Sequence, residues 1–184
     1  EEEFDDMNTY INHQRDFLLS WAAVKQMEGK YLRKDRVTNK IYETPQFLYM
    51  LIAATIFNDY PKKTRMDYVK KYYDAISTFE ISLPTPIMAG LRTPVKQFSS
   101  CVLIESDDSL PSINTTASSI VSYISKKAGI GVNAGRIRGI GSTIRNGEAY
   151  HTGVVPFYRY FQSAVKSCSQ GGVRGGAATL YVPV

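Results

Sequence analysis

The sequence has 184 residues, of which 43% are hydrophobic and 12% aromatic, a composition that indicates a globular protein and excludes a disordered chain. It has no run of about 18 apolar residues, so no membrane-spanning helix is predicted. The net charge of +5 is unevenly placed, because residues 1–90 carry 12 basic and 13 acidic side chains and residues 91–184 carry 10 and 4. The second half also holds 11 of the 13 glycines. A solvated basic face is the first explanation of this charge, but a basic, glycine-rich composition also suits ligands that carry phosphate.

The cysteines and histidines restrict the metal and disulfide chemistry that can be expected. Cys101 and Cys168 are too few for a disulfide scaffold and wrongly spaced for a zinc site, which favours an intracellular protein. His13 and His151 form no metal-binding motif, so we predict no metal site in this chain. The first residues, EEEFDD, show no signal-peptide pattern.

The first half has the apolar periodicity of helices. Apolar residues recur at helical spacing between Met7 and Met27. Thr44 as N-cap and Pro45 at the first helical position predict a helix that is apolar all round and therefore central to a core. Pro61 predicts the start of another helix, whose apolar face holds Met66, Val69, Tyr72, Tyr73 and Ile76. Packing explains these helices, and they carry no functional signal.

The second half alternates strands and helices. Residues 81–94 contain three prolines and are expected to form an extended connection. A buried strand is predicted over Phe98–Ile104, with Cys101 in its middle. A helix over 109–128, a strand from Gly129 followed by a glycine-rich loop, a helix over 151–169 and a strand over 175–184 complete the order. The first of these helices should bury Ile113, Ala117, Ile120, Val121 and Ile124. This alternation predicts a parallel α/β sheet, whose ligands usually bind beyond the carboxyl ends of the strands.

The glycine loops and the polar turn each have a structural explanation besides a functional one. Neither GIGVNAGRIRGIGS nor GGVRGGAAT matches a dinucleotide or P-loop fingerprint, and each loop alone indicates a turn. GGVRGG lies between a periodic helix and a strand rather than in a disordered tract, so we predict no nucleic-acid binding. The local pattern around Cys101 predicts an inert core thiol. The local pattern of Asp107, Asp108 and Ser109 predicts a helix cap.

Five blocks in one order give a more specific signal: LPTPIMAGLRTP, QFSSCVLIE, KAGIGVNAGRIR, GEAYHTG and VKSCSQGGVRGGAAT. Together they resemble the large subunit of class I ribonucleotide reductases, most closely the bacterial and T-even phage type, from about Met7 to the last residue. The third block opens with Lys127 where the family pattern has arginine. The resemblance implies an α+β and α/β fold in which residues 1–94 are a helical domain. Residues 95–184 would be the first part of a ten-stranded α/β barrel, which is therefore incomplete here.

The resemblance implies reduction of ribonucleoside diphosphates to deoxyribonucleoside diphosphates by thiol and radical chemistry. Cys101 corresponds to one of the two thiols that reduce the 2′ carbon and end as a disulfide. Cys168 does not correspond to the other thiol and is expected to pack at a helix end. The residues implied in substrate binding are Thr85, Ser100, Ala128, Gly129 and Arg174.

The resemblance also implies an allosteric site for a deoxynucleoside triphosphate or ATP at a homodimer interface. Its residues would be Asp108, Ser109, Leu110, Arg138, Ile144 and Arg145. A relay loop would carry the effector signal to the substrate base, and it comprises Ser169, Gln170, Gly171, Gly172, Val173, Arg174 and Gly175. Glycine permits the backbone changes that such a loop requires.

Other parts of the family's machinery have no counterpart in this sequence, among them the radical-bearing cysteine and the second redox cysteine. We therefore expect a fragment or split part of the large subunit, with no cofactor in this chain. Its expected partners are a chain with the rest of the large subunit, a metal-containing small subunit that supplies the radical, and a reductant of the thioredoxin or glutaredoxin type. The expected location is the cytoplasm of a bacterium or of a phage-infected host. The alternative is a non-catalytic remnant that binds a nucleotide effector or a partner chain.

Overall fold

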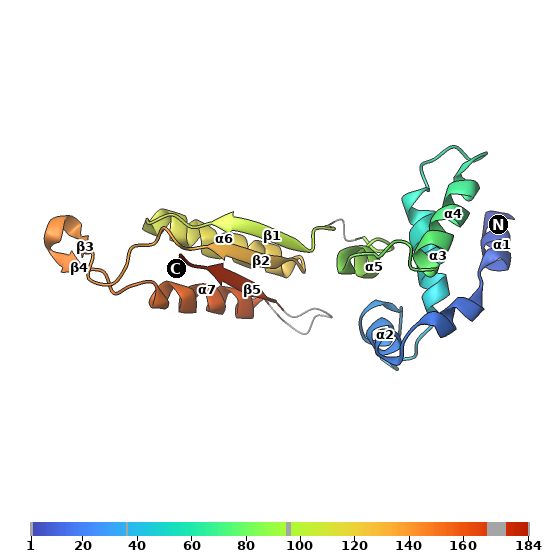
Figure 1. The fold of residues 1–184 in the computed structure, drawn as a ribbon, viewed down its shortest axis with the longest axis horizontal. Coiled ribbons are helices and arrows are strands. Elements are labelled where there is room, and N and C mark those ends of the chain that lie inside the picture. Colours follow the sequence, from blue (N-terminus) through green and yellow to red (C-terminus); the bar gives the residue numbers. More distant parts are fainter. Residues whose placement is uncertain (1, 36, 95–96, 169–175, 184) are drawn as a thin grey trace. The chain divides into compact units, whose positions relative to one another are not determined.

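The computed structural model describes residues 2–35, 37–94, 97–168 and 176–183, and the chain divides into two compact units (Figure 1). The first unit, Glu1–Phe98, is helical, and the second, Ser99–Val184, contains a parallel sheet. No helix in these described ranges is long and apolar enough to cross a membrane. The same ranges hold no group of three or more His, Cys, Asp or Glu side chains that could bind a metal ion.

The core of the first unit is centred on α3 (Pro45–Ile56) and α4 (Arg65–Ser77), and Met7, Met27, Leu32 and Met88 from other segments complete it. Thr44 caps α3 as predicted, because its Oγ1 accepts a hydrogen bond from the Phe47 amide at 3.4 Å. The prediction that α3 is buried on most sides is confirmed by its buried residues Gln46, Leu48, Tyr49, Met50, Ile52 and Ala53. Helix α4 buries Val69, Tyr73 and Ile76, as its periodicity predicts. Pro61, however, opens the turn before α4 and not the helix itself.

The helical spacing of residues 7–27 is confirmed, but it belongs to a succession of short elements, because the side chains of Asn12 and Ser20 cap new helical turns. These elements are α1 (Glu2–Tyr10), the 3₁₀ helix η1 (His13–Leu18), α2 (Trp21–Gln26) and the π-helix η2 (Met27–Tyr31). The prediction of an extended connection over 81–94 is wrong in part, because these residues include the short helix α5 (Thr85–Gly90). Pro86 lies in its first turn, where a missing N–H costs no hydrogen bond.

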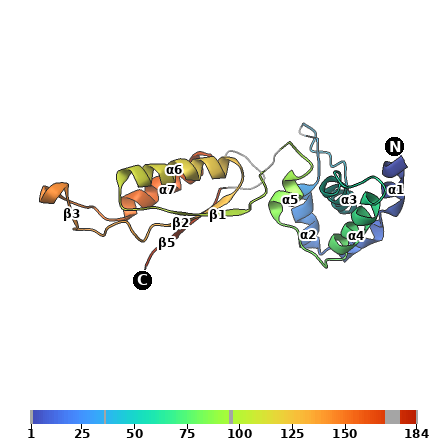
Figure 2. The same cartoon turned by 90° about the horizontal axis from the view of Figure 1, so that it is seen from above.

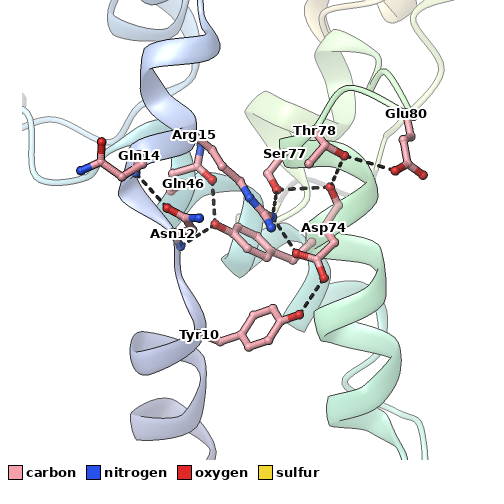
Figure 3. Close-up of polar contacts among 10 residues, drawn as sticks. Tyr10, Asn12, Gln14, Arg15, Gln46, Asp74, Ser77, Thr78 and Glu80 are labelled. Atoms are coloured by element: carbon pink, nitrogen blue, oxygen red, sulfur yellow. Dashed lines mark hydrogen bonds and ion pairs between the residues drawn. The ribbon is translucent and has the colours of Figure 1, made fainter.

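A polar network joins α4 to the segment between α1 and η1 (Figure 3). The fully buried Tyr73 donates its hydroxyl hydrogen to Gln46 Oε1 at 2.7 Å and accepts a hydrogen bond from the Asn12 amide at 2.9 Å. Next to it, Arg15 Nη1 donates to Asp74 Oδ1 at 2.6 Å. Each buried polar group of this network therefore has a partner, as stability requires.

The second unit contains a three-stranded parallel sheet, which confirms the α/β prediction. Its strands are β1 (Cys101–Glu105), β2 (Gly129–Asn133) and β5 (Ala178–Tyr181), in the order β1-β2-β5. Helices α6 (Leu110–Ser125) and α7 (Val155–Ser167) lie on one side of these strands (Figure 2). A hairpin of β3 (Thr143–Ile144) and β4 (Ala149–Tyr150), with the short helix η3 (Arg145–Gly147) between them, lies within the predicted glycine-rich loop.

The core of this unit is formed by the sheet face that α6 and α7 cover. Four of the five predicted core residues of α6 are buried, but Val121 is 36% exposed because it lies at the edge of the apolar stripe. The predicted strand over Phe98–Ile104 actually begins at Cys101, and this thiol is exposed rather than buried. Alternate residues of β1 point to opposite faces, so Val102 and Ile104 meet the helices while Cys101 faces away.

Candidate functional site

The sheet face opposite α6 and α7 is open and carries the candidate redox thiol. Cys101, Leu103 and Glu105 are exposed on this face of β1, and Tyr181 is exposed at the end of β5. A Cβ atom on Gly131 would lie 2.4 Å from Leu103 Cδ2 and 2.9 Å from Tyr181 Cε2. The side chains of Leu103 and Tyr181 therefore cover the central strand at Gly131, which has no side chain of its own. A thiol on an open face can meet a small-molecule ligand, which a core thiol cannot.

Four of the predicted substrate-site and redox residues come together at the amino ends of β1 and β2. Cys101 is the register partner of Gly129, and the Gly129 amide donates to the Ser100 carbonyl at 2.9 Å. Ala128 is buried directly before β2. Because Gly129 has no side chain, the space beside Cys101 stays free for a ligand. Ligands of parallel α/β sheets usually bind at the carboxyl ends of the strands, so these four residues lie at the other end of the sheet from the one that topology predicts.

Lys127, two residues before β2, has a strained backbone conformation. It has a φ of 67°, in the left-handed region that glycine usually occupies at the end of a helix. The Ala128 amide donates to the Tyr123 carbonyl at 3.1 Å, and the Lys127 amide donates to the Ile124 carbonyl at 2.9 Å. These two hydrogen bonds form the Schellman motif that ends α6 and starts β2.

At the carboxyl ends of the strands, Asp108 and Arg138 form a close ion pair. Arg138 Nε donates to Asp108 Oδ2 at 2.6 Å, and the Arg138 amide donates to Asp108 Oδ1 at 3.1 Å. Arg138 Nη1 also donates to the Thr143 carbonyl at 3.0 Å. Asp108 thus fixes the start of the glycine-rich loop, and Arg138 connects that loop to the β3–β4 hairpin.

The charge of Asp108 is stabilised by its environment. Partial burial by itself raises the pKa of this carboxyl group, but the two hydrogen bonds and the positive charge of Arg138 outweigh it. The resulting pKa of Asp108 is lower than the ordinary value, with a smaller contribution from His151. Asp108 therefore remains ionised and paired with Arg138 at neutral pH.

The remaining predicted effector residues lie at the start of α6, next to Asp108 in the sequence, and in the hairpin that Arg138 contacts through the Thr143 carbonyl. The Ser112 amide donates to Ser109 Oγ at 3.3 Å, which confirms that Ser109 caps α6. Leu110 is 66% exposed at the first position of α6. Ile144 is half-buried in β3, and Arg145 is exposed with a φ of 52°. The structure thus brings these side chains to one region of the second unit, at the opposite end of the sheet from Cys101.

The other predicted residues lie elsewhere. Thr85 belongs to the first unit, where its Oγ1 lies 3.0 Å from the Tyr31 hydroxyl oxygen. Cys168 caps the end of α7 and packs half-buried against the second core, as predicted. The relay loop Ser169–Gly175, which includes Arg174, lies outside the described residues.

Sequence reasoning missed a set of contacts around Thr85. Tyr31 contacts Thr85 through its hydroxyl, and its carbonyl oxygen accepts a hydrogen bond from Arg92 Nη2 at 3.3 Å. Arg92 is paired in turn with Glu43, and both side chains are only 9% exposed. No periodicity or motif signals these contacts, because the paired residues are 49 to 61 positions apart in the sequence.

Comparison with known proteins assigns both units to one family. The all-alpha domain of ribonucleotide reductase matches residues 17–96, and its barrel domain matches residues 99–184. The chain is 69% identical over 183 residues to the ribonucleoside-diphosphate reductase subunit alpha of Haemophilus influenzae. It is 67% identical over 184 residues to the ribonucleoside-diphosphate reductase 1 subunit alpha of Escherichia coli, and 56% identical over 183 residues to the ribonucleoside-diphosphate reductase subunit alpha of phage T4. Each alignment covers 100% of this chain and 24% of the relative, so the chain spans about a quarter of the length of these curated relatives. The first half of the chain thus matches the all-alpha domain and the second half the barrel domain, and the chain belongs to the family of ribonucleotide reductase large subunits.

Proposed function

We propose that this chain provides one reducing thiol, part of the substrate site and the allosteric site of a ribonucleoside-diphosphate reductase. The observation that carries the proposal is the position of Cys101, exposed on the open sheet face beside the side-chain-free Gly129. Similarity to relatives named ribonucleoside-diphosphate reductase supports it.

The proposed reaction replaces the 2′-hydroxyl group of a ribonucleoside diphosphate with hydrogen. Two thiols give up two electrons and two protons, the C2′–O bond breaks, the oxygen leaves as water, and the two sulfurs join in a disulfide. Cys101 is one of these thiols. The other comes from outside residues 1–184, since Cys168 packs against the core at the end of α7. A small subunit supplies the radical, and a dithiol protein of the thioredoxin or glutaredoxin type reduces the disulfide again.

In the second unit, the substrate site is proposed to include the amino ends of β1 and β2, where the Ser100 hydroxyl group can donate a hydrogen bond to the diphosphate or ribose. In the first unit, Thr85 is proposed from the family resemblance as a second hydroxyl group that binds the substrate. Ala128 and Gly129 offer backbone without bulky side chains, which allows a sugar and base to approach. Arg174 contributes the cation of the relay loop.

The effector, a deoxynucleoside triphosphate or ATP, is proposed to bind at the carboxyl ends of the strands. Arg138 and Arg145 supply positive charge for phosphates, and Asp108, Ser109, Leu110 and Ile144 hold the sugar and base. Leu110, Ile140 and Val155 are exposed apolar side chains in the elements around the Asp108–Arg138 pair. Their exposure supports the proposal that this region is also a homodimer interface.

The open sheet is proposed to be the start of a ten-stranded α/β barrel. Among the described strands, β1 and β5 each have a neighbour on one side only. Further strands from a chain carrying the rest of the large subunit would pair with these edges and enclose Cys101. The proposed location is the cytoplasm of a bacterium or a phage-infected host.

The test is Cys101→Ser in a reductase assembled from this chain and the subunits that complete it. Serine cannot form the disulfide that carries the two electrons, so steady-state deoxynucleotide formation with a dithiol reductant should be lost. Cys168→Ser is the matched control and should retain most activity. Normal turnover by Cys101→Ser would refute the assignment.

The second candidate is a non-catalytic chain that binds only an effector nucleotide or a partner chain. It is favoured by the Asp108–Arg138 site, which is formed entirely within the second unit. This candidate predicts nucleoside triphosphate binding together with no product formation in the assembled protein, whatever residue occupies position 101.

A further inference from the structure

We propose that Tyr31 is a positioning residue that orients the Thr85 hydroxyl toward a phosphate oxygen of the nucleoside diphosphate. This inference rests on the proposed role of Thr85 in substrate binding. The carrying observation is the 3.0 Å contact between the Tyr31 hydroxyl and Thr85 Oγ1, which joins two residues 54 positions apart inside the first unit.

The direction of this hydrogen bond follows from the chemistry of the two hydroxyl groups. A phenol is a stronger donor and a weaker acceptor than an aliphatic hydroxyl group. Tyr31 therefore donates to Thr85 Oγ1, and the Thr85 hydrogen remains available for another acceptor. An anionic phosphate oxygen is the strongest acceptor that a substrate offers, and hydrogen bonds in a chain strengthen one another.

The backbone of Tyr31 is held at the same time by a partly buried ion pair. Arg92 donates to both carboxylate oxygens of Glu43, at 2.5 and 2.9 Å, and also to the Tyr31 carbonyl. Glu43 Oε1 accepts a further hydrogen bond from the Arg33 amide at 2.7 Å. Tyr31 is thus fixed at both its carbonyl and its hydroxyl oxygen, an arrangement that a residue serving only to fill space would not need.

Tyr31 is also the last residue of the π-helix η2. The Leu32 amide donates to the Met27 carbonyl at 2.9 Å, which closes this wide turn. π-helical turns are uncommon and occur frequently at functional sites. The turn and the Arg92–Glu43 pair together determine where the phenol of Tyr31 points.

The experiment compares Tyr31→Phe with the unmodified protein in the assembled reductase. The substitution keeps the ring and removes only the hydroxyl, so KM for the nucleoside diphosphate should rise about three- to tenfold, the effect of one neutral hydrogen bond. Turnover at saturating substrate should change less than twofold, because no reacting group is altered. Tyr42→Phe, which removes an exposed hydroxyl that contacts Asp35 in the same unit, should leave KM unchanged.

A double-mutant cycle tests whether Tyr31 acts through Thr85. Thr85→Val alone should raise KM, and Tyr31→Phe should add nothing to it, whereas Thr85→Ser should stay sensitive to Tyr31→Phe. If Thr85→Val leaves KM unchanged, the proposed function of Thr85 fails. If Thr85→Val raises KM but Tyr31→Phe does not, or if the two effects add fully, this inference is overturned. Equal losses of substrate and effector binding in Tyr31→Phe would also overturn it, since they would reflect a general folding defect.

Discussion

At the end of α6, Lys127 occupies a backbone conformation that costs a non-glycine residue about 1–2 kcal/mol. Lys127→Gly should therefore stabilise the chain, after subtraction of the greater chain entropy of glycine, by about 0.5–1 kcal/mol. Urea unfolding followed by circular dichroism measures the difference. Lys126→Gly is the matched control, because Lys126 has a φ of −93° and loses the same charge without relief of strain. A Lys127→Gly variant no more stable than this control would contradict the account.

Asp108 and Arg138 are linked by two hydrogen bonds, so we expect the proposed effector site to need both residues. Asp108→Ala or Arg138→Ala should weaken nucleoside triphosphate binding by about 1.5–3 kcal/mol, the range for a hydrogen bond to a charged group. The double variant should lose little more than either single one, because each residue depends on the other. Equilibrium binding of a labelled nucleotide measures all three.

Arg174→Ala separates the proposed effector site from the proposed relay loop. It should leave effector affinity near normal and reduce the discrimination between substrates, because Arg174 is expected to contact the substrate and not the effector. Competition between two nucleoside diphosphates in the assembled reductase measures this discrimination. Equal loss of effector binding in the Asp108, Arg138 and Arg174 variants would show that the division is wrong.

At the scale of elements, the hydroxyl of Tyr73 joins α4 to α3 and to the segment after α1. Tyr73→Phe would leave Gln46 Oε1 without this buried donor and the Asn12 amide without its acceptor, at a cost of about 1–3 kcal/mol. Tyr72→Phe, one residue earlier on the same helix, should cost much less because Tyr72 lies only partly buried beside the core. Thermal unfolding compares the two, and equal stabilities would argue against the network.

The elements that sequence could predict are those with a long, uninterrupted pattern. Helices α3, α4, α6 and α7 and strands β1, β2 and β5 all follow from apolar periodicity and caps. The division of residues 7–27 into short helical elements could not be predicted, because Asn12 and Ser20 interrupt an apolar pattern that looks continuous. Helix α5 was hidden by its prolines, one of which lies in the first turn, where it is tolerated.

The candidate site could be predicted only in part, and for a different reason. Cys101, Asp108 and Arg138 were found through resemblance of short sequence blocks, since periodicity placed Cys101 in a core. The Tyr31–Thr85 contact and the Arg92–Glu43 pair join distant parts of the chain, and only the folded structure brings such residues together. The proximity of Ser100 and Gly129 likewise depends on the register of β1 and β2.

At the scale of the whole molecule, the two units contribute different parts of one proposed enzyme. The helical unit provides Thr85 and the residues that hold it. In the second unit, Cys101, Ser100 and Gly129 lie at one end of the sheet and the Asp108–Arg138 pair lies at the other. This separation lets reduction and effector binding be tested independently in the same protein.

The central claim is that Cys101 is a reducing thiol, and mapping the cysteines after a single turnover tests it most directly. The assembled reductase would convert one equivalent of nucleoside diphosphate without external reductant, be quenched with an alkylating reagent and be analysed by peptide mass spectrometry. We expect Cys101 to be alkylated before turnover and protected in a disulfide after it, while Cys168 reacts equally in both samples. Equal alkylation of Cys101 before and after product formation would contradict the account.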